Sequence, residues 1–322
     1  MTLPILVVAE SSARYYWELQ TLFYNLTVTR NIDASNIILL TYGNETLMNQ
    51  LKDVFRIQTY FYKDDRPSKN YSSSIRPYLI AKYLKQKDAA TSFLYIDSDI
   101  LLLQDIDFSK YESPSKFAYA STAEYVSDAF LESKGNGEDY VAYLDKYLPL
   151  SDIQHLYLHN VRVGAQWFLN NMTPAFFEEM YELCEKIFKD WYMHANFVDD
   201  YEGEKKHFTS ADLWLVDMFV LLRLLVIHGY YVEEDPKMSF AWPMQEITES
   251  DQYMFLHNAG VNPLDKTEHI DLFWKGSPDW SKELPYEHDL SYVRANSYSE
   301  QYVKEMLKMK AYLEQKKRQS VT

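Results

Sequence analysis

The segment FLYIDSDILLL, residues 93–103, decides how the rest of this sequence is interpreted. Four apolar or aromatic residues lead directly into two acids, Asp97 and Asp99, which a single residue separates. A buried strand has such a continuous apolar run, and carboxylates at its end leave the core while staying fixed in space. Open α/β sheets bind their ligands at the carboxyl ends of strands. The pattern therefore predicts a ligand site at Asp97 and Asp99.

The first hundred residues alternate strand and helix patterns, which is typical of a parallel sheet. Strand candidates are ILVVAE, NIILLTY, FRIQTYF and SFLYID. Between them, the amphipathic segment SSSIRPYLIAKYLKQ places Ile75, Leu79 and Tyr83 on one helical face. We therefore expect an α/β fold, with a Rossmann-like, mostly parallel central sheet flanked by helices.

The later sequence continues with VGAQWFLNN, a strand candidate that begins at Val163, and with an apolar helix candidate from Leu213 to Ile227. The last helix candidate has apolar residues at helical spacing and a basic end: Tyr302, Met306, Met309 and Leu313, then Lys316, Lys317 and Arg318. No internal repeat or Gly/Ser linker interrupts the chain. We expect one domain over residues 1–290 and a C-terminal helix with a basic tail over residues 291–322.

The bulk composition limits the environment of the protein. The formal net charge of −15 disfavours broad, sequence-independent adhesion to nucleic acid. One cysteine, Cys184, excludes an intrachain disulfide and suits a reducing compartment. The opening MTLPILVVAE has no basic stretch or cleavage site, and the apolar run 213–227 is shorter than the ~20 residues of a bilayer span. We expect a cytoplasmic protein with no stable membrane insertion. Whether it forms a homodimer is left open by the sequence.

The two acids suggest a chemistry of their own. Carboxylates one residue apart can both reach a hard divalent cation, which takes oxygen ligands and shares them with phosphates. The pair therefore indicates metal-assisted handling of a nucleotide. The structural alternative is a pair of solvated acids at a strand end.

FLYIDSDILLL resembles the D-x-D motif of GT-A-fold glycosyltransferases, and the segment order resembles their glycogenin-like, retaining branch (glycosyltransferase family 8). The resemblance runs from about residue 3 to 280. IRPYLIAKYL resembles the helix that sends a basic residue to the sugar nucleotide, and VGAQWFLNN resembles the strand that lines the donor-sugar pocket. TSADLWLVDMF resembles the segment with a donor-side aspartate, FLHNAGVN the late His-x-x-Gly element, and FWKGSPDW the segment that closes over the diphosphate.

The resemblance implies a role for each matching residue. The implied ligands of Mn²⁺ (or Mg²⁺) are Asp97, Asp99 and His257. Asp212 and Gln166 are the implied catalytic residues and contact donor-sugar hydroxyls. The implied donor-binding residues are Arg76, Asp97, Ser98, Gly164, Ala165, Gly260 and Lys275. Two features depart from the family pattern: the glycine lies in VGAQ, and Lys275 lies farther from His257 than expected, so Lys266 is its rival.

The implied activity is metal-dependent transfer of a sugar from a nucleoside diphosphate sugar to a hydroxyl, with retention of configuration. A UDP-sugar is the default donor. The acceptor is a glycan, a protein or a modified nucleobase. Loops often carry specificity, so the expected acceptor walls are residues 122–160 and 198–208.

Other interpretations stay open. In a haloacid-dehalogenase-like phosphatase, Asp97 would be the nucleophile and FVDD, residues 197–200, a second acidic pair. A non-catalytic sugar- or nucleotide-binding module is the third class. Single residues also have structural alternatives. Thr209 and Asp212 fit a capping box, and His155 and His159 fit structural or acceptor-loop roles. Trp167, Trp214 and Tyr83 are expected in the core.

Overall fold

The computed structural model describes residues 3–123, 125–134, 140–194, 212–259 and 270–321. The chain forms two compact units. The first unit comprises Met1–Lys63, Ile96–Ser109 and Lys237–Thr322, and the second comprises Asp64–Tyr95 and Lys110–Pro236. Both units contain helices and strands, so the expected α/β class is confirmed.

Three parallel strands form the base of the first unit, in the order β3-β2-β1. They are β1 (Ile5–Ser11), β2 (Ile37–Gly43) and β3 (Gln58–Phe61). The register sets Ile5 opposite Ile37. The residues of β1 from Ile5 to Ala9 are all buried, as expected for a strand that is covered on both faces.

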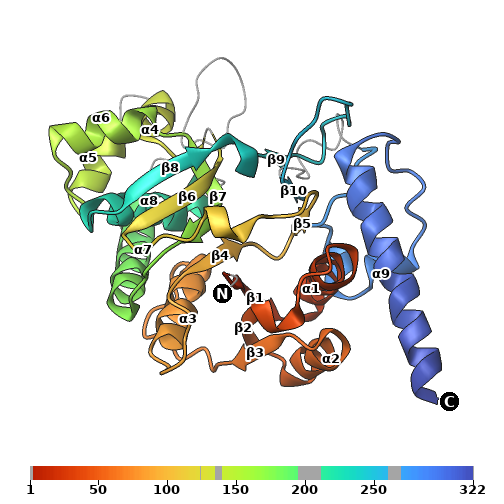
Figure 1. The fold of residues 1–322 in the computed structure, drawn as a ribbon. Coiled ribbons are helices and arrows are strands. Elements are labelled where there is room, and N and C mark those ends of the chain that lie inside the picture. Colours follow the sequence, from red (N-terminus) through yellow and green to blue (C-terminus); the bar gives the residue numbers. More distant parts are fainter. Residues whose placement is uncertain (1–2, 124, 135–139, 195–211, 260–269, 322) are drawn as a thin grey trace. The chain divides into compact units, whose positions relative to one another are not determined.

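The helices of the first unit are α1 (Ala13–Tyr24), α2 (Glu45–Phe55) and α9 (Tyr298–Val321). Helices α1 and α9 lie side by side (Figure 1). Between them, the ring of Trp17 meets Phe273 and Tyr302 edge-on, at 5.6 and 6.4 Å between centroids. Met306 and Met309 are fully buried in the same cluster, so the helical spacing of the last segment is confirmed. The domain boundary at residue 290 stays a prediction.

A smaller sheet in the first unit positions the acid pair. Its order is β5-β10-β9, with β5 (Ile100–Leu102), β10 (Phe255–His257) and β9 (Phe240–Ala241). Strand β5 begins directly after Asp99, and its antiparallel pairing with β10 sets Ile100 opposite His257. The backbone N–H of Asn258 also donates to the carbonyl of Asp99, at 3.0 Å. The register therefore brings His257 to the acid pair.

The strands of the second unit follow the order β4-β7-β6-β8. They are β4 (Phe93–Ile96), β7 (Val163–Leu169), β6 (Phe117–Thr122) and β8 (Tyr231–Asp235). The last residue of β4, Ile96, is also the first residue of a segment that belongs to the first unit. Strand β7 is antiparallel to β4 and β6, whereas β8 is parallel to β6. The register of β6 on β7 shifts between Ala120 and Ser121, and Ala165 has a φ of 46°. This bulge lies in the predicted donor segment VGAQ.

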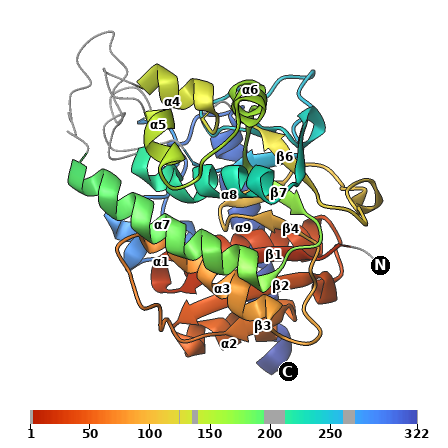
Figure 2. The same cartoon turned by 90° about the vertical axis from the view of Figure 1, so that its left-hand side faces the viewer.

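Helices α3 (Ile75–Leu84) and α7 (Pro174–His194) pack side by side in the second unit (Figure 2). Helix α8 (Val216–Ile227) follows η5 (Asp212–Leu215) and is almost wholly buried, as predicted for an apolar run. The helices of this unit are α3 (Ile75–Leu84), α4 (Asp128–Lys134), α5 (Tyr140–Asp145), α6 (Asp152–Asn160), α7 (Pro174–His194) and α8 (Val216–Ile227).

Trp167 and Tyr83 are buried as expected, but the core prediction for Trp214 is wrong, because 59% of this residue is exposed. The tight 3₁₀ turn η5 precedes α8, so Trp214 does not follow the helical spacing of the apolar run. A membrane span needs about 20 apolar residues, and no helix among the described residues is both that long and that apolar.

Candidate metal and donor site

Asp97 and Asp99 lie in the short turn between β4 and β5, where 9% and 3% of each residue is exposed. One ligand atom from each acid and one from His257 lie within 4.8 Å of one another. The first unit thus brings together the three residues that the resemblance implies as metal ligands. The apolar run of β4 explains their position, because it ends where the chain turns.

Aromatic packing holds the third member of this group, His257. Its ring stacks on Trp242 at 5.7 Å between centroids and meets Phe240 edge-on at 5.4 Å. Nε2 faces Asp99, 3.5 Å from Oδ1, while the buried Nδ1 has no hydrogen-bond partner among the described residues. Packing therefore orients the imidazole with Nε2 toward the acids.

Lys275 is the cation of the site. Its Nζ donates a hydrogen bond to Asp99 Oδ2, and 27% of its side chain is exposed. Although burial disfavours the charged carboxylate, Lys275 and His257 hold the pKa of Asp99 well below its usual range. The pKa of Lys275 is raised: burial opposes the charge, but Asp99, Glu18 and Asp97 outweigh it. Lys275 thus occupies the position implied for it, whereas Lys266 lies outside the described residues.

Glu18 belongs to this site and was missed by the sequence interpretation. It lies on α1, only 1% exposed, and accepts a hydrogen bond from the Ser98 hydroxyl at 2.9 Å. Burial, together with the negative charge of Asp99, raises the pKa of Glu18 to about 7, against the opposing effects of Lys275 and Ser98. One signal was available, since Glu18 precedes Leu22 by one helical turn and shares its buried face.

The chemistry of this group fits a divalent metal. Carboxylate oxygens suit Mg²⁺ and Mn²⁺, and an imidazole nitrogen favours the transition metal of the two. Asp97, Asp99 and Glu18 are three carboxyl groups near a single ammonium, Lys275. The site is therefore rich in negative charge, and the ligand atoms of Asp97, Asp99 and His257 lie close enough together to bind one cation.

In the second unit, the predicted donor residue Arg76 forms an ion pair on α3. Its NH1 lies 3.1 Å from Oδ2 of Asp217, a residue that is 5% exposed. The hydroxyl of Tyr71 donates to the other carboxylate oxygen of Asp217, at 2.7 Å. The sequence alone showed Asp217 only as an interruption of an apolar run, and a buried acid in such a run was the available signal.

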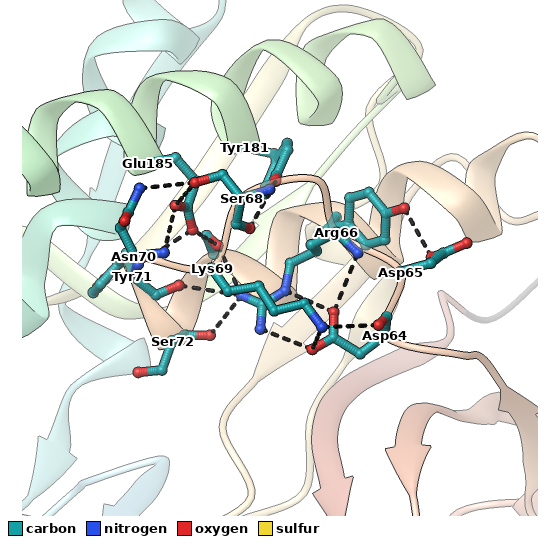
Figure 3. A network of polar contacts seen from close by, with 12 residues as sticks. Asp64, Asp65, Arg66, Ser68, Lys69, Asn70, Tyr71, Ser72, Tyr181 and Glu185 are labelled. Atoms are coloured by element: carbon teal, nitrogen blue, oxygen red, sulfur yellow. Dashed lines mark hydrogen bonds and ion pairs between the residues drawn. The ribbon is translucent and has the colours of Figure 1, made fainter.

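A polar network fixes the segment that leads into α3 (Figure 3). One part of this network is built on the carboxylate of Glu185 on α7, which is 5% exposed. It accepts hydrogen bonds from Ser68 Oγ at 2.6 Å, Asn70 N at 2.7 Å, Tyr71 N at 3.2 Å and Ser74 Oγ at 2.5 Å. Burial alone raises its pKa, yet these donors lower it overall. The network therefore holds the start of α3, and with it Arg76, against α7.

Gly164, Ala165 and Gln166 lie on β7. A Cβ added to Gly164 would approach the Cβ of Ala123 to 2.9 Å, so the glycine permits close packing. Gln166 is fully buried, and both polar atoms of its amide have no hydrogen-bond partner among the described residues. Buried amides are normally bonded because leaving them unpaired is costly. Gln166 is therefore a good candidate for a ligand contact.

The other predicted residues are only partly described. Asp212 is the first residue of η5 in the second unit, and its side chain is not described. Gly260, Thr209, the 198–208 wall and the FVDD pair all lie outside the described residues. Ser98 joins the first-unit group through Glu18.

A cavity of about 460 Å³ in the second unit lies within the predicted acceptor stretch 122–160. Its lining comes from α4, α5 and α6: Asp128, Glu132, Val141, Ala142, Asp145, His155, Leu156 and His159. His155 bridges Asp128 and Asp145 through its two ring nitrogens, at 2.9 and 3.1 Å. Buried Arg223 also forms ion pairs with both acids. These contacts agree with a structural role for His155, which is one of the two roles that the sequence left open.

No family model and no curated protein matches the chain. Several solved structures are similar in part. One is the WbbM bifunctional glycosyltransferase, with 13% identity and a TM-score of 0.48 over 81% of this chain and 46% of that chain. Another is the galactosyltransferase LgtC in complex with donor and acceptor sugar analogs, with 13% identity and a TM-score of 0.47 over 80% and 87%. A third is the glycosyltransferase GlyE of Streptococcus pneumoniae TIGR4, with 10% identity and a TM-score of 0.39 over 74% and 46%. The chain spans about half the length of WbbM and GlyE.

Proposed function

We propose that the protein is a metal-dependent glycosyltransferase that moves a sugar from a nucleoside diphosphate sugar to a hydroxyl acceptor. The grouping of Asp97, Asp99 and His257 beside Lys275 carries this proposal. Two carboxylates, an imidazole and an ammonium suit the binding of a diphosphate together with a divalent cation. Mn²⁺ is favoured over Mg²⁺ because of the imidazole. Retention of configuration rests on the sequence resemblance.

Each site residue of the first unit has a proposed role in this reaction. Asp97, Asp99 and His257 hold the cation, which supplies charge stabilisation to the departing diphosphate. Lys275 adds a second positive charge at the same place. The stack of His257 on Trp242 keeps the imidazole oriented, and Ser98, bonded to Glu18, fixes the turn between the two acids.

The donor sugar is assigned to the residues that the resemblance implies for it. We assign Gln166 to donor hydroxyls because a buried amide without a protein partner has both donors and acceptors to offer. Gly164 and Ala165 allow close approach at the bulge, and Asp212 keeps the role that the resemblance implies. Arg76 keeps the donor-binding role that the resemblance implies, and Asp217 orients its guanidinium. UDP is the default nucleotide.

The acceptor is assigned to the cavity formed by α4, α5 and α6. Its polar lining of histidines and carboxylates can bond to several hydroxyls, which suits a glycan or a protein hydroxyl. Three acids among the lining residues disfavour a phosphate-bearing acceptor such as nucleic acid. The buried single cysteine agrees with the proposed cytoplasmic location.

Donor hydrolysis tests the proposal. The protein is incubated with a panel of nucleotide sugars and Mn²⁺, and the released nucleoside diphosphate is measured with and without a chelator. We expect release from one donor, and its loss with chelator and in Asp97→Ala. The matched control is Asp105→Ala, which removes a 90% exposed carboxylate shortly after the site. Metal-dependent hydrolysis of phosphomonoesters would instead identify a phosphatase, and binding without turnover would identify a binding module.

A further inference from the structure

Strand β5, which begins directly after Asp99, is an edge strand of its three-stranded sheet among the described residues. On the side of β10, Leu103 N donates to the carbonyl of Met254 at 2.8 Å, and the carbonyl of Asp99 accepts from Asn258 N at 3.0 Å. Hydrogen-bonded and non-hydrogen-bonded pairs alternate along an antiparallel ladder, so Leu102 directs its N–H and C=O away from β10. These two groups of an edge strand need partners of another kind.

The side chain of Asn25 provides both partners. Its Oδ1 accepts a hydrogen bond from Leu102 N at 2.8 Å, and its Nδ2 donates to the Leu102 carbonyl at 3.3 Å. Arg30 Nε donates to the same carbonyl at 2.8 Å, and Arg30 NH2 donates to the carbonyl of Leu103. Asn25 and Arg30 thus take the place of a neighbouring strand along β5.

An uncommon local conformation places these two side chains. Asn25 begins the π-helical turn η1 (Asn25–Thr29), which follows α1, and Arg30 N donates to the Asn25 carbonyl at 2.8 Å. Turns of this kind are rare and occur frequently at functional sites. Asn25 is only 2% exposed, so its amide is committed to partners inside the protein.

The C-terminal helix α9 contributes a further partner of Asn25. Glu305 is 6% exposed, and its Oε1 accepts hydrogen bonds from Asn25 Nδ2 at 3.0 Å and from the Thr29 hydroxyl. The amide of Asn25 fits in one orientation, because the Leu102 N–H can only donate and the carboxylate can only accept. A row of hydrogen bonds therefore leads from α9 through Asn25 to β5.

We propose that Asn25 and Glu305 are positioning residues of the metal site, which hold β5 in the register that brings His257 to Asp99. This inference rests on the proposed function and extends it to the C-terminal helix. A slip of β5 by one residue against β10 would reverse the direction of its backbone groups, and Leu102 would lose both bonds to Asn25. The amide therefore stabilises the register in which the proposed metal ligands meet.

Asn25→Leu tests this role, because it nearly preserves the side-chain volume but removes the amide. The Leu102 N–H loses its partner, and Mn²⁺ should bind about tenfold more weakly. The swapped pair, Asn25→Asp together with Glu305→Gln, restores the main contacts: the introduced carboxylate accepts from Leu102 N, and the introduced amide donates to that carboxylate. This double variant has the net charge of the wild type and should bind Mn²⁺ within about threefold of it.

Two more variants complete the set. Arg30→Lys is milder, because an ammonium lacks the fixed fork of a guanidinium and replaces only part of its bonds to Leu102 and Leu103. The Arg30 side chain is 23% exposed, and this variant should weaken binding about threefold. Leu51→Ala is the matched control: it removes a buried side chain from α2 of the same unit, so it should lower the unfolding temperature but leave Mn²⁺ affinity within about twofold.

The experiment is Mn²⁺ titration of the full chain without donor, followed by the electron paramagnetic resonance signal of free Mn²⁺, with thermal unfolding of every variant. We expect weaker binding in Asn25→Leu and Arg30→Lys, recovery in the swapped pair and no loss in Leu51→Ala.

Three results would overturn the positioning role while leaving the metal site intact. One is wild-type affinity in Asn25→Leu or, if that protein does not fold, in Arg30→Lys. The second is a swapped pair that binds as weakly as Asn25→Leu. The third is an equal loss in Leu51→Ala, because affinity would then follow overall stability. Equal binding by wild type and Asp97→Ala would overturn the metal site, and the positioning role with it.

Discussion

The imidazole Nε2 of His257 lies 3.5 Å from Oδ1 of Asp99, although the two residues come from opposite halves of the sequence. The cause is the antiparallel pairing of β10 with β5, which sets His257 opposite Ile100. Neighbouring residues of a strand point to opposite faces, so a slip of one residue would turn His257 away from the acids. The metal site therefore depends on the register of a three-residue strand.

Substitution of Asp99 should remove metal binding without unfolding the protein. Asp99→Asn preserves the shape of a buried side chain but removes the charge that binds a cation, so Mn²⁺ affinity should fall about 100-fold or more. The unfolding temperature should change little, because Lys275 still has Asp97 and Glu18 nearby. Free Mn²⁺ and thermal unfolding are the two measurements. Retention of wild-type affinity would show that Asp99 is not a ligand.

Asp217→Ala should destabilise the second unit strongly. It removes the buried partner of Arg76 and of the Tyr71 hydroxyl together, which should lower the free energy of unfolding by roughly 2–4 kcal/mol. Tyr71→Phe removes the hydroxyl that contacts the Asp217 carboxylate, the Trp214 carbonyl and the Asp217 N–H, and it should cost roughly 1–2 kcal/mol. Urea denaturation gives both values, with exposed Asp105→Ala as the control within about 0.5 kcal/mol of wild type. A cost for Asp217→Ala no larger than that of Asp105→Ala would mean that the ion pair contributes nothing.

Local sequence patterns predicted the parts of the structure that burial alone determines. The apolar run before Asp97 predicted the end of a strand, although the acids that follow it are buried rather than outside the core, and the spacing of Tyr302, Met306 and Met309 predicted a buried helical face. The first pattern is visible because a strand covered on both faces is continuously apolar, and the second because a buried helical face repeats every three or four residues. The grouping of His257 with the acids came from a family resemblance, since no local pattern encodes the pairing of β10 with β5.

The sequence interpretation failed where a residue's environment is set by distant segments. Glu18 and Asp217 are acids inside apolar sequence patterns. Such a pattern does not show whether the acid has a hydrogen-bond or ion-pair partner in the folded protein. Their partners, Ser98 and Arg76, lie many residues away. Trp214 was assigned to the core because its neighbours are apolar, but a 3₁₀ turn leaves it exposed.

Gln166→Met should separate stability from activity. The amide of Gln166 is buried and has no partner among the described residues, so an apolar side chain of similar volume should leave the free energy of unfolding unchanged or raise it. Donor hydrolysis should nevertheless fall by about 100-fold, because the hydrogen bonds to the donor sugar are lost. Gly164→Ala is the comparison variant: its Cβ would crowd Ala123, and it should lower stability by about 1–3 kcal/mol. A Gln166→Met protein that is less stable but fully active would place Gln166 in the core and outside the donor site.

The pH dependence of stability should reveal Glu18 in the metal-free protein. Its pKa is raised from 4.5 to about 7, mainly by burial and further by Asp99, while Lys275, Ser98 and Arg14 oppose the shift. Between these two values the folded chain keeps a proton that the unfolded chain has released, so the free energy of unfolding should fall as the pH rises. Relative to Glu18→Gln, which does not titrate, wild type should lose roughly 3 kcal/mol across this window.

Urea denaturation with a chelator, repeated at intervals from pH 4.5 to pH 8, measures this difference. Ser98→Ala removes a hydrogen bond that favours the charged carboxylate, so in this variant the decline should extend to higher pH. Parallel curves for wild type and Glu18→Gln would mean that Glu18 has the same pKa in the folded and unfolded chains. Because burial is the first cause of the shift, that result would also mean that water reaches Glu18 in solution.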